Sequence, residues 1–444
     1  MSSSLLIKNV RVVNEGEIRD LEILIKNDRI EKIAPQISSK ESQEIDGKGL
    51  FLLPGCIDDQ VHFREPGFPH KANIASESMA AVAGGVTSFM DMPNTVPNTL
   101  TRDLLEDKYG IASLTSVANY SFYMGTSHDN IEELLRINKK NVCGVKIFMG
   151  SSTGNMLVDN ESVLHAIFSK VDSLIAVHCE DENTILNNVL DFDSEYGIKL
   201  SAQQHPLIRS REACLKSSTF AAQLAKEHNT RLHILHISTQ DEVSLFQNNI
   251  PLSEKKITSE ACVHHLYFSD EDYKKLGNEI KCNPAIKTKA DRAAIRSALE
   301  TGHIDVIATD HAPHTMEEKQ KNYREAPSGL PLIQHSLRMA LTIGEENNWS
   351  LPFIVEKMSH NVAECFRIQD RGYIREGYFA DLVLLDLEDS AKVTKDELLY
   401  KCNWSPLEGR KLKGRIASTY VNGKEVYDGS KIIAHKKGQR LSFF

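Results

Sequence analysis

The sequence lacks the features of secreted, membrane-spanning and nucleic-acid-binding proteins. None of its eight cysteines forms a C-x-x-C pair or a disulfide framework, so we expect reduced thiols. No apolar run reaches the about 18 residues of a transmembrane helix, and the first residues show no signal-peptide pattern. With 52 basic and 61 acidic residues, the net charge of −9 offers no basic surface for nucleic acid or an anionic membrane. We therefore expect a cytoplasmic protein that acts on a small molecule, without a nucleic-acid or membrane partner.

The composition is that of a globular protein with a large core. Hydrophobic residues make up 41% of the 444 residues and charged residues 25%, which is ordinary for such a chain. At about 150 residues per domain, the length corresponds to about three domains, or to one large barrel with a smaller attachment. The sequence does not fix the oligomeric state, and a homodimer is compatible with it.

Both ends of the chain are rich in short predicted strands. Asn27-Asp28 and Asn422-Gly423 each separate two apolar runs, and such dipeptides are typical of two-residue β-hairpins. We therefore expect residues 1–50 and 371–444 to join in one small β-sandwich domain.

The middle of the chain, residues 51–370, has the rhythm of an α/β protein. Apolar, β-rich runs alternate there with helical stretches, as parallel strands with helical crossovers require. Eight runs occur, at 51–61, 87–92, 119–123, 144–148, 174–177, 232–235, 257–262 and 305–308. This number predicts a (β/α)₈ barrel of the TIM type. The pattern assigns no structure to the long connection 181–230.

Residues that can bind a metal or move protons follow most of these runs. They are His62, Lys146, His178, His236, His264, His265 and Asp310. A lone histidine is more often structural, but a barrel gathers the carboxyl ends of its strands on one face and places its active site there. Imidazole and carboxylate are ligands of Zn²⁺, and an open coordination position lowers the pKa of bound water to about 7. The sequence therefore predicts the metal site of a hydrolase.

Lys146 is the unusual member of this set. An ammonium group among metal ligands repels the cation and is costly to bury without a partner. One interpretation is a surface lysine with a buried aliphatic stem. The other is a lysine that has reacted with CO₂ to a carbamate, whose two oxygens can bridge two cations.

Two motifs carry a resemblance to a known family. They are HFREPG at 62–67 and ATDHAPH at 308–314, supported by MPNT at 92–95, LHIST at 235–239, CNP at 282–284 and GYFADLV at 377–383. With these motifs the chain resembles the amidohydrolase superfamily and, within it, the dihydroorotases of the long barrel-plus-sandwich type, over essentially its whole length. The resemblance implies interconversion of N-carbamoyl-L-aspartate and dihydroorotate in pyrimidine biosynthesis.

The resemblance also implies roles for individual residues. The implied metal ligands, for one or two zinc ions per chain, are His62, Lys146 as a carbamate, His178, His236 and Asp310. Asp310 is further implied as the proton-transferring residue. The implied substrate contacts are Arg64, as a planar fork for a carboxylate, with Asn94, Asn283 and His314. Hydrogen bonds around the site are expected from His233, His264, His265 and His311. The segment 326–331 stands at the place of the family's glycine-containing substrate loop.

One position departs from the family pattern. The first strand of the family ends in His-x-His, where this chain has Gln60-Val61-His62, and an amide oxygen is a poorer zinc ligand than imidazole. Three interpretations stay open: Gln60 or a water completes the site, the enzyme works with one zinc on Lys146, His178 and His236, or catalysis is lost and the chain is a scaffold. A hydantoinase or allantoinase is a further alternative, but its substrates lack the carboxylate that Arg64 would bind.

Overall fold

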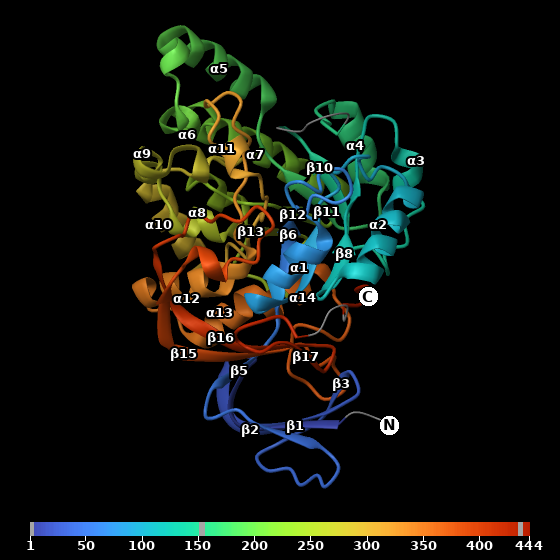
Figure 1. Cartoon of the computed structure of the whole chain (residues 1–444). Coiled ribbons are helices and arrows are strands. Elements are labelled where there is room, and N and C mark those ends of the chain that lie inside the picture. Colours follow the sequence, from blue (N-terminus) through green and yellow to red (C-terminus); the bar gives the residue numbers. More distant parts are fainter. Residues whose placement is uncertain (1–3, 151–155, 434–437) are drawn as a thin grey trace.

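The computed structural model describes residues 4–150, 156–433 and 438–444. A barrel surrounded by helices forms the upper part of Figure 1, and strands from the N-terminal end lie below it. No helix in these described ranges is long and apolar enough to cross a membrane.

The barrel consists of parallel strands that follow one another along the chain. They are β6 (Cys56–Val61), β7 (Val86–Asp91), β8 (Asn119–Phe122), β9 (Met124–Gly125), β10 (Val145–Phe148), β11 (Ile175–His178), β12 (Leu232–Ile234), β13 (Ile257–Cys262) and β14 (Val306–Ala308). β8 pairs with β7 and β9 with β10, so these two short strands share one position in the barrel. A parallel bridge between Val61 and His311 joins the last strand to the first. The predicted (β/α)₈ barrel is therefore confirmed.

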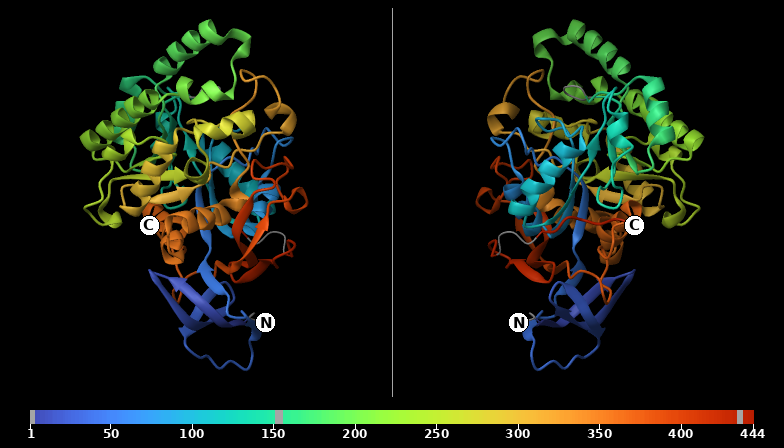
Figure 2. Two further views of the ribbon diagram at one scale, coloured as in Figure 1. Left: turned by 90° about the vertical axis from the view of Figure 1, so that its left-hand side faces the viewer. Right: turned by 90° about the vertical axis from the view of Figure 1, so that its right-hand side faces the viewer.

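Helices cover the outside of the barrel (Figure 2). The α-helices are α1 (Ile74–Ala83), α2 (Arg102–Thr115), α3 (Ile131–Leu134), α4 (Glu161–Lys170), α5 (Glu182–Tyr196), α6 (His205–Ile208), α7 (Arg211–His228), α8 (Val263–Tyr267), α9 (Tyr273–Leu276), α10 (Lys289–Glu300), α11 (Met316–Lys319), α12 (Ser336–Asn347), α13 (Leu351–Val355) and α14 (Asn361–Phe366). The unassigned connection 181–230 thus holds α5, α6 and α7, and α5 lies at the end of the molecule opposite the N-terminus (Figure 1).

Strands from both chain ends form one mixed sheet. Its members are β1 (Ser4–Asn14), β2 (Glu17–Lys26), β3 (Arg29–Ala34), β4 (Gln43–Asp46), β5 (Phe51–Pro54), β15 (Leu382–Lys392), β16 (Lys411–Val421) and β17 (Lys424–Tyr427). The order is β17-β16-β15-β5-β1-β2-β3, with β4 beside β1. Ile7, Ile23, Leu52 and Leu382 are fully buried in this sheet's core. The expected union of the two ends is therefore present, and both predicted hairpins form, between β2 and β3 and between β16 and β17.

The predicted run 51–61 is two strands rather than one. β5 pairs in the terminal sheet with β1 and β15, and β6 starts the barrel after Gly55. A Cβ atom at Gly55 would lie 2.0 Å from Oγ1 of Thr87, so only glycine fits where the chain leaves one sheet and enters the other. An apolar run does not show this division, because both strands are buried and equally hydrophobic.

Gly423→Ala is expected to lower the free energy of unfolding more than Gly16→Ala does. Both glycines have positive φ, 70° and 82°, a conformation that costs an L-residue about 1–2 kcal/mol. A Cβ at Gly423 would also lie 2.5 Å from the carbonyl oxygen of Asn27, where the two hairpins meet, whereas Gly16 has no atom within 4 Å. Urea denaturation of both variants measures the difference, and equal losses would contradict this contact between the chain ends.

Candidate active site

A polar cavity of about 100 Å³ opens at the carboxyl ends of the barrel strands. Eight of the nine residues predicted as ligands, substrate contacts or acid-base groups line it: His62, Arg64, Asn94, Lys146, His178, His236, Asn283 and Asp310. Gln60, Phe148, Ala312, Ser328 and Gly329 complete the wall. Residues far apart in the sequence thus converge because each follows a different strand of one barrel.

His178 and His236 face each other across the ends of β11 and β12. Nδ1 of His178 lies 2.9 Å from Nε2 of His236, and Nε2 of His178 lies 2.9 Å from Oε2 of Glu180. Burial acts to raise the pKa of Glu180, but the Arg209 guanidinium and the hydrogen bond of His178 outweigh it and lower the pKa to about 2. The ionised carboxylate can only accept a hydrogen bond, so Nε2 of His178 carries the hydrogen and Nδ1 has a lone pair that faces Nε2 of His236.

His62 and Asp310 form the opposite side of the centre. Nε2 of His62 lies 3.1 Å from Oδ1 of Asp310, and its Nδ1 lies 2.8 Å from Oδ1 of Asn94. Burial acts to raise the pKa of Asp310, but the hydrogen bond and charge of His62, with His264 and Lys146 nearby, bring it below its ordinary value. Asp310 is therefore ionised near neutral pH and can accept a proton or bind a cation.

Lys146 on β10 is buried between these two pairs. Only 1% of its surface is exposed, and its Nζ lies 4.6 Å from the centre of the Phe148 ring. Burial lowers the pKa of Lys146 to about 7, so a large part of the amine is neutral near neutral pH. A neutral amine is the form that reacts with CO₂. The interpretation as an exposed surface lysine is wrong.

Arg64 lines the cavity, and its guanidinium group is held by Pro313 and His314. Its Nε donates to the carbonyl oxygen of Pro313 at 3.1 Å, and its Nη2 lies 2.9 Å from Nε2 of His314. Burial lowers the pKa of Arg64 to about 10, so it stays charged. His314 is not among the lining residues and also contacts Lys71, at 3.0 Å. His314 therefore lies behind the wall, in contact with the lining residues Arg64 and Ser328.

Three of the site residues have a backbone conformation that is rare for their type. Arg64, His236 and Asp310 have positive φ values of 67°, 42° and 49°. Such a conformation costs energy and persists where the surroundings impose it, commonly at functional sites. Each residue stands just after a barrel strand, where the turn aims its side chain into the cavity.

Gln60 stands where the family pattern has a histidine. Its side chain lies on the cavity wall, and its Oε1 accepts a hydrogen bond from Sγ of Cys262 at 3.5 Å. Cys262, at the end of β13, is fully buried. The amide oxygen is thus turned toward a neighbouring thiol.

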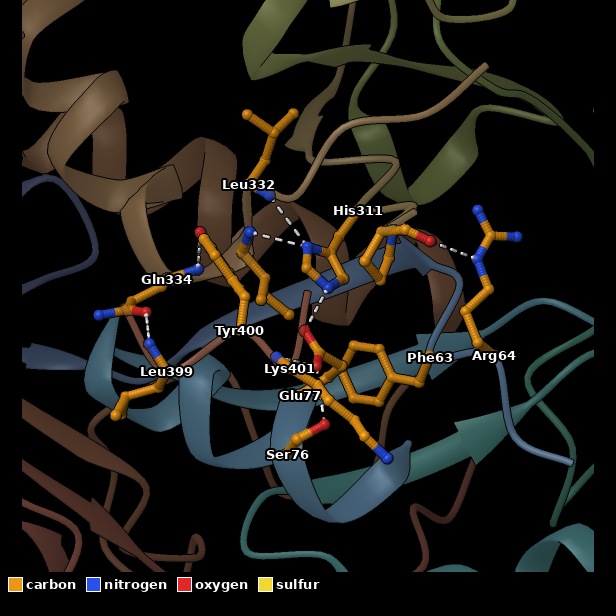
Figure 3. A network of polar contacts seen from close by, with 12 residues as sticks. Phe63, Arg64, Ser76, Glu77, His311, Leu332, Gln334, Leu399, Tyr400 and Lys401 are labelled. Carbon is orange, nitrogen blue, oxygen red and sulfur yellow. Dashed lines mark hydrogen bonds and ion pairs between the residues drawn. The ribbon is translucent and has the colours of Figure 1, made fainter. Parts of the chain in front are cut away.

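The surrounding histidines have different environments. His311 turns away from Arg64 and contacts Glu77 at 2.9 Å, while its Nδ1 accepts the backbone N–H of Leu332 (Figure 3). His233 contacts Asp59 at 3.2 Å and Glu260 at 3.5 Å. The expected hydrogen bonds are present for His311, for His233 through its Nδ1 and Oγ1 of Thr258 at 2.8 Å, and for His265 through Pro284. His264 forms none, since neither of its ring nitrogens has a hydrogen-bond partner among the described residues.

Sequence reasoning missed two residues of this region. Glu180 orients His178 and is fully buried; its place two residues after a predicted ligand was the available signal. Ser328 lines the cavity and donates its Oγ hydrogen to Oδ1 of Asn283 at 3.0 Å, which gives the segment 326–331 a contact with the site.

The residues at this centre fit a bound cation. Lys146 is buried at this centre, and Nδ1 of His236 has no hydrogen-bond partner within the described ranges. Burial also lowers the pKa of His178 and, strongly, that of His236, so both imidazoles are neutral. Neutral imidazoles beside an ionised carboxylate form a donor set suited to zinc.

Comparisons with known proteins agree with the fold and the motifs. The model of the amidohydrolase family matches residues 51–426. The chain is 34% identical over 434 residues to the dihydroorotase of Lactococcus lactis subsp. lactis, covering 96% of this chain and 99% of that protein. It is 32% identical over 426 residues to the dihydroorotase of Halobacterium salinarum, covering 95% and 96%. The solved structure of an L-hydantoinase (dihydropyrimidinase) from Arthrobacter aurescens superposes with a TM-score of 0.93 at 27% identity over 100% of both chains.

The chain belongs to the amidohydrolase family. The resemblance to dihydroorotases drawn from the motifs is confirmed by relatives that span nearly the whole chain. The predicted hydrolase acting on cyclic amides is confirmed with it.

Proposed function

We propose that the protein is a zinc-dependent dihydroorotase that interconverts N-carbamoyl-L-aspartate and dihydroorotate. The observation that carries this proposal is the pairing, in one small cavity, of a charged Arg64 with a buried donor set. The donors are His62, Lys146, His178, His236 and Asp310. Arg64 matches a carboxylate, and the donors match the metal chemistry of amide hydrolysis.

His178 and His236 would hold one zinc ion and His62 and Asp310 another, with the Lys146 carbamate between them. The carbamate forms when the neutral amine adds to CO₂ and loses a proton. When bound, zinc polarises the amide carbonyl and makes water more acidic. Glu180 keeps His178 in the tautomer with a free Nδ1 for this purpose.

Asp310 would move the proton of the reaction. In the hydrolytic direction its ionised carboxylate takes a proton from the attacking water and passes it to the leaving ring nitrogen. The reverse path serves ring closure, in which the amide nitrogen loses a proton and water leaves. The hydrogen bond of His62 fixes the orientation of this carboxylate.

Arg64 would bind the carboxylate that both substrates carry. Its Nε is held by Pro313, so Nη1 remains for the ligand, with Nη2 beside His314. Asn94 and Asn283 add polar contacts at the wall. His314 would act by fixing Arg64 and not by touching the substrate.

A hydantoinase is the second candidate function. The observation in its favour is the overall likeness to the L-hydantoinase structure. The dihydroorotases are more similar in sequence, at 32% and 34% against 27% identity. Turnover of dihydroorotate and of hydantoin by the zinc-loaded protein tests both candidates. Hydrolysis of hydantoin without dihydroorotate turnover would overturn the proposal.

Arg64→Met is expected to raise the KM for carbamoyl aspartate and for dihydroorotate by about 10- to 100-fold. The variant removes a charge-assisted bond to carboxylate that contributes about 1.5–3 kcal/mol. Steady-state kinetics in both directions measures the effect, and zinc content should stay at the wild-type level. Unchanged KM values would point to a substrate without a carboxylate.

Gln60→His is expected to bring the zinc content of the catalytic donors toward two per chain by restoring the third side chain of the His62 site. Metal analysis after dialysis against a weak chelator measures this. Gln60→Ala is the matched variant: it should change zinc content little if the amide is only a spacer and lower it if the amide oxygen is a ligand. A wild-type protein whose catalytic donors already hold two zinc ions as tightly as those of Gln60→His would contradict the idea of a weakened site.

A further inference from the structure

A second group of metal-binding side chains lies beside the active site. Sγ of Cys262 and ring nitrogens of His264 and His265 all lie within 4.8 Å of one another. The three side chains are at most 3% exposed. They stand at the end of β13 and the start of α8 and include none of the proposed catalytic ligands.

The ring nitrogens of this group lack partners. Nε2 of His265 contacts the carbonyl oxygen of Pro284 at 3.0 Å; a carbonyl only accepts, so Nε2 carries the hydrogen and Nδ1 is left with a lone pair. Nδ1 of His265 and both nitrogens of His264 have no hydrogen-bond partner in the described part of the chain. Leaving a buried polar group unpaired is unfavourable because the group has lost its hydrogen bonds to water, and a shared cation would remove this cost.

We infer that Cys262, His264 and His265 bind an additional zinc ion, separate from the catalytic centre. One thiolate and two neutral imidazoles are a donor set that zinc prefers. Binding would require Sγ to release its proton to solvent and to leave its hydrogen bonds to Gln60 and Glu260, each 3.5 Å long. The ion would thereby free the amide of Gln60 at the wall of the active site.

The neighbouring cluster of Asp59, His233 and Glu260 also contains buried polar atoms without hydrogen bonds, but it differs from the Cys262 group in charge. His233 bridges the two carboxylates, and its Nδ1 contacts Oγ1 of Thr258 at 2.8 Å. Burial acts to lower the pKa of His233, but the two carboxylates raise it to about 9. An imidazolium therefore already supplies the positive charge there, whereas the Cys262 group has none.

Zinc X-ray absorption of the full-length protein at zinc saturation tests the inference. None of the proposed catalytic donors contains sulfur, so a Zn–S distance of about 2.3 Å must come from a cysteine. We expect this sulfur signal in the wild type and its loss in Cys262→Ser, with one zinc less per chain. Cys282→Ser is the matched control, since Cys282 is equally buried and its Sγ contacts the same Pro284 carbonyl; it should keep the signal.

Cobalt substitution separates the two sites. Thiolate bound to Co²⁺ absorbs in the near ultraviolet, and this band should disappear in His264→Gln and His265→Gln but persist in Lys146→Ala. A saturated wild type without a sulfur signal would overturn the inference even if every variant failed to fold. Loss of the band in Lys146→Ala, or its survival in Cys262→Ser, would also overturn a separate site built on Cys262.

Discussion

Lys146→Ala is expected to lose nearly all zinc from the catalytic donors and to reduce turnover of dihydroorotate to background. Lys146 lies between His178 with His236 and His62 with Asp310, and no other lysine lines the cavity. Without a carbamate, no bridging ligand would connect the His178 and His236 pair with the His62 and Asp310 pair. An alanine methyl group cannot bind a cation. Metal analysis and a spectrophotometric assay measure the two losses together.

Lys319→Met is the matched control for this variant. Lys319 is also buried, and burial lowers its pKa to about 7 as well. Its Nζ, however, donates to the carbonyl oxygens of Lys281, Pro327 and Gly329. Zinc content should therefore survive in Lys319→Met. Short carboxylic acids are expected to restore part of the zinc binding of Lys146→Ala. A zinc content of Lys146→Ala equal to that of the wild type would show that Lys146 does not bridge two metal ions.

Asp310→Asn is expected to lower kcat by about 10²- to 10⁴-fold, the usual contribution of a positioned acid-base group. An amide cannot take the proton of the attacking water, and it binds zinc more weakly than a carboxylate does. Pre-steady-state and steady-state rates at saturating zinc separate the lost proton transfer from lost metal.

Asp58→Asn is the control for Asp310→Asn. Burial raises the pKa of Asp58 to about 8, so this carboxyl is largely protonated near neutral pH. An amide resembles the protonated form, and Oδ1 could still accept the backbone N–H groups of Gln60 and Thr309. Only a small change in kcat is expected. Equal losses in both variants would mean that Asp310 acts by supporting structure and not by moving a proton.

The sequence predicted the barrel and most of the cavity wall because both follow from short-range rules. An apolar run such as 174–177 identifies a buried strand, and a ligand such as His178 directly after it must lie at the strand's carboxyl end. Because the carboxyl ends of all barrel strands lie on one face, these residues lie close together once the barrel is closed. Eight residues named from the sequence line one cavity for this reason.

The remaining features depend on tertiary contacts that no local pattern contains. The ionised state of Glu180 depends on Arg209, which approaches from a helical connection without a clear sequence signal. His314 follows the same strand as Asp310, yet it is not among the lining residues and instead contacts Arg64 and Ser328. The thiol of Cys262 meets Gln60 only because barrel closure places β13 and β6 on either side of β14.

The pairing of β5 with β15 has a consequence for the order in which the chain can fold. Leu382 pairs with Pro54, so the edge of β5 stays exposed on the ribosome until almost the whole barrel has been synthesised. Long-range strand pairing of this kind is slow, and an unpaired edge can join another chain in the meantime. The first catalytic strand follows β5 directly, so premature association of nascent chains at β5 would interfere with the formation of the active site itself.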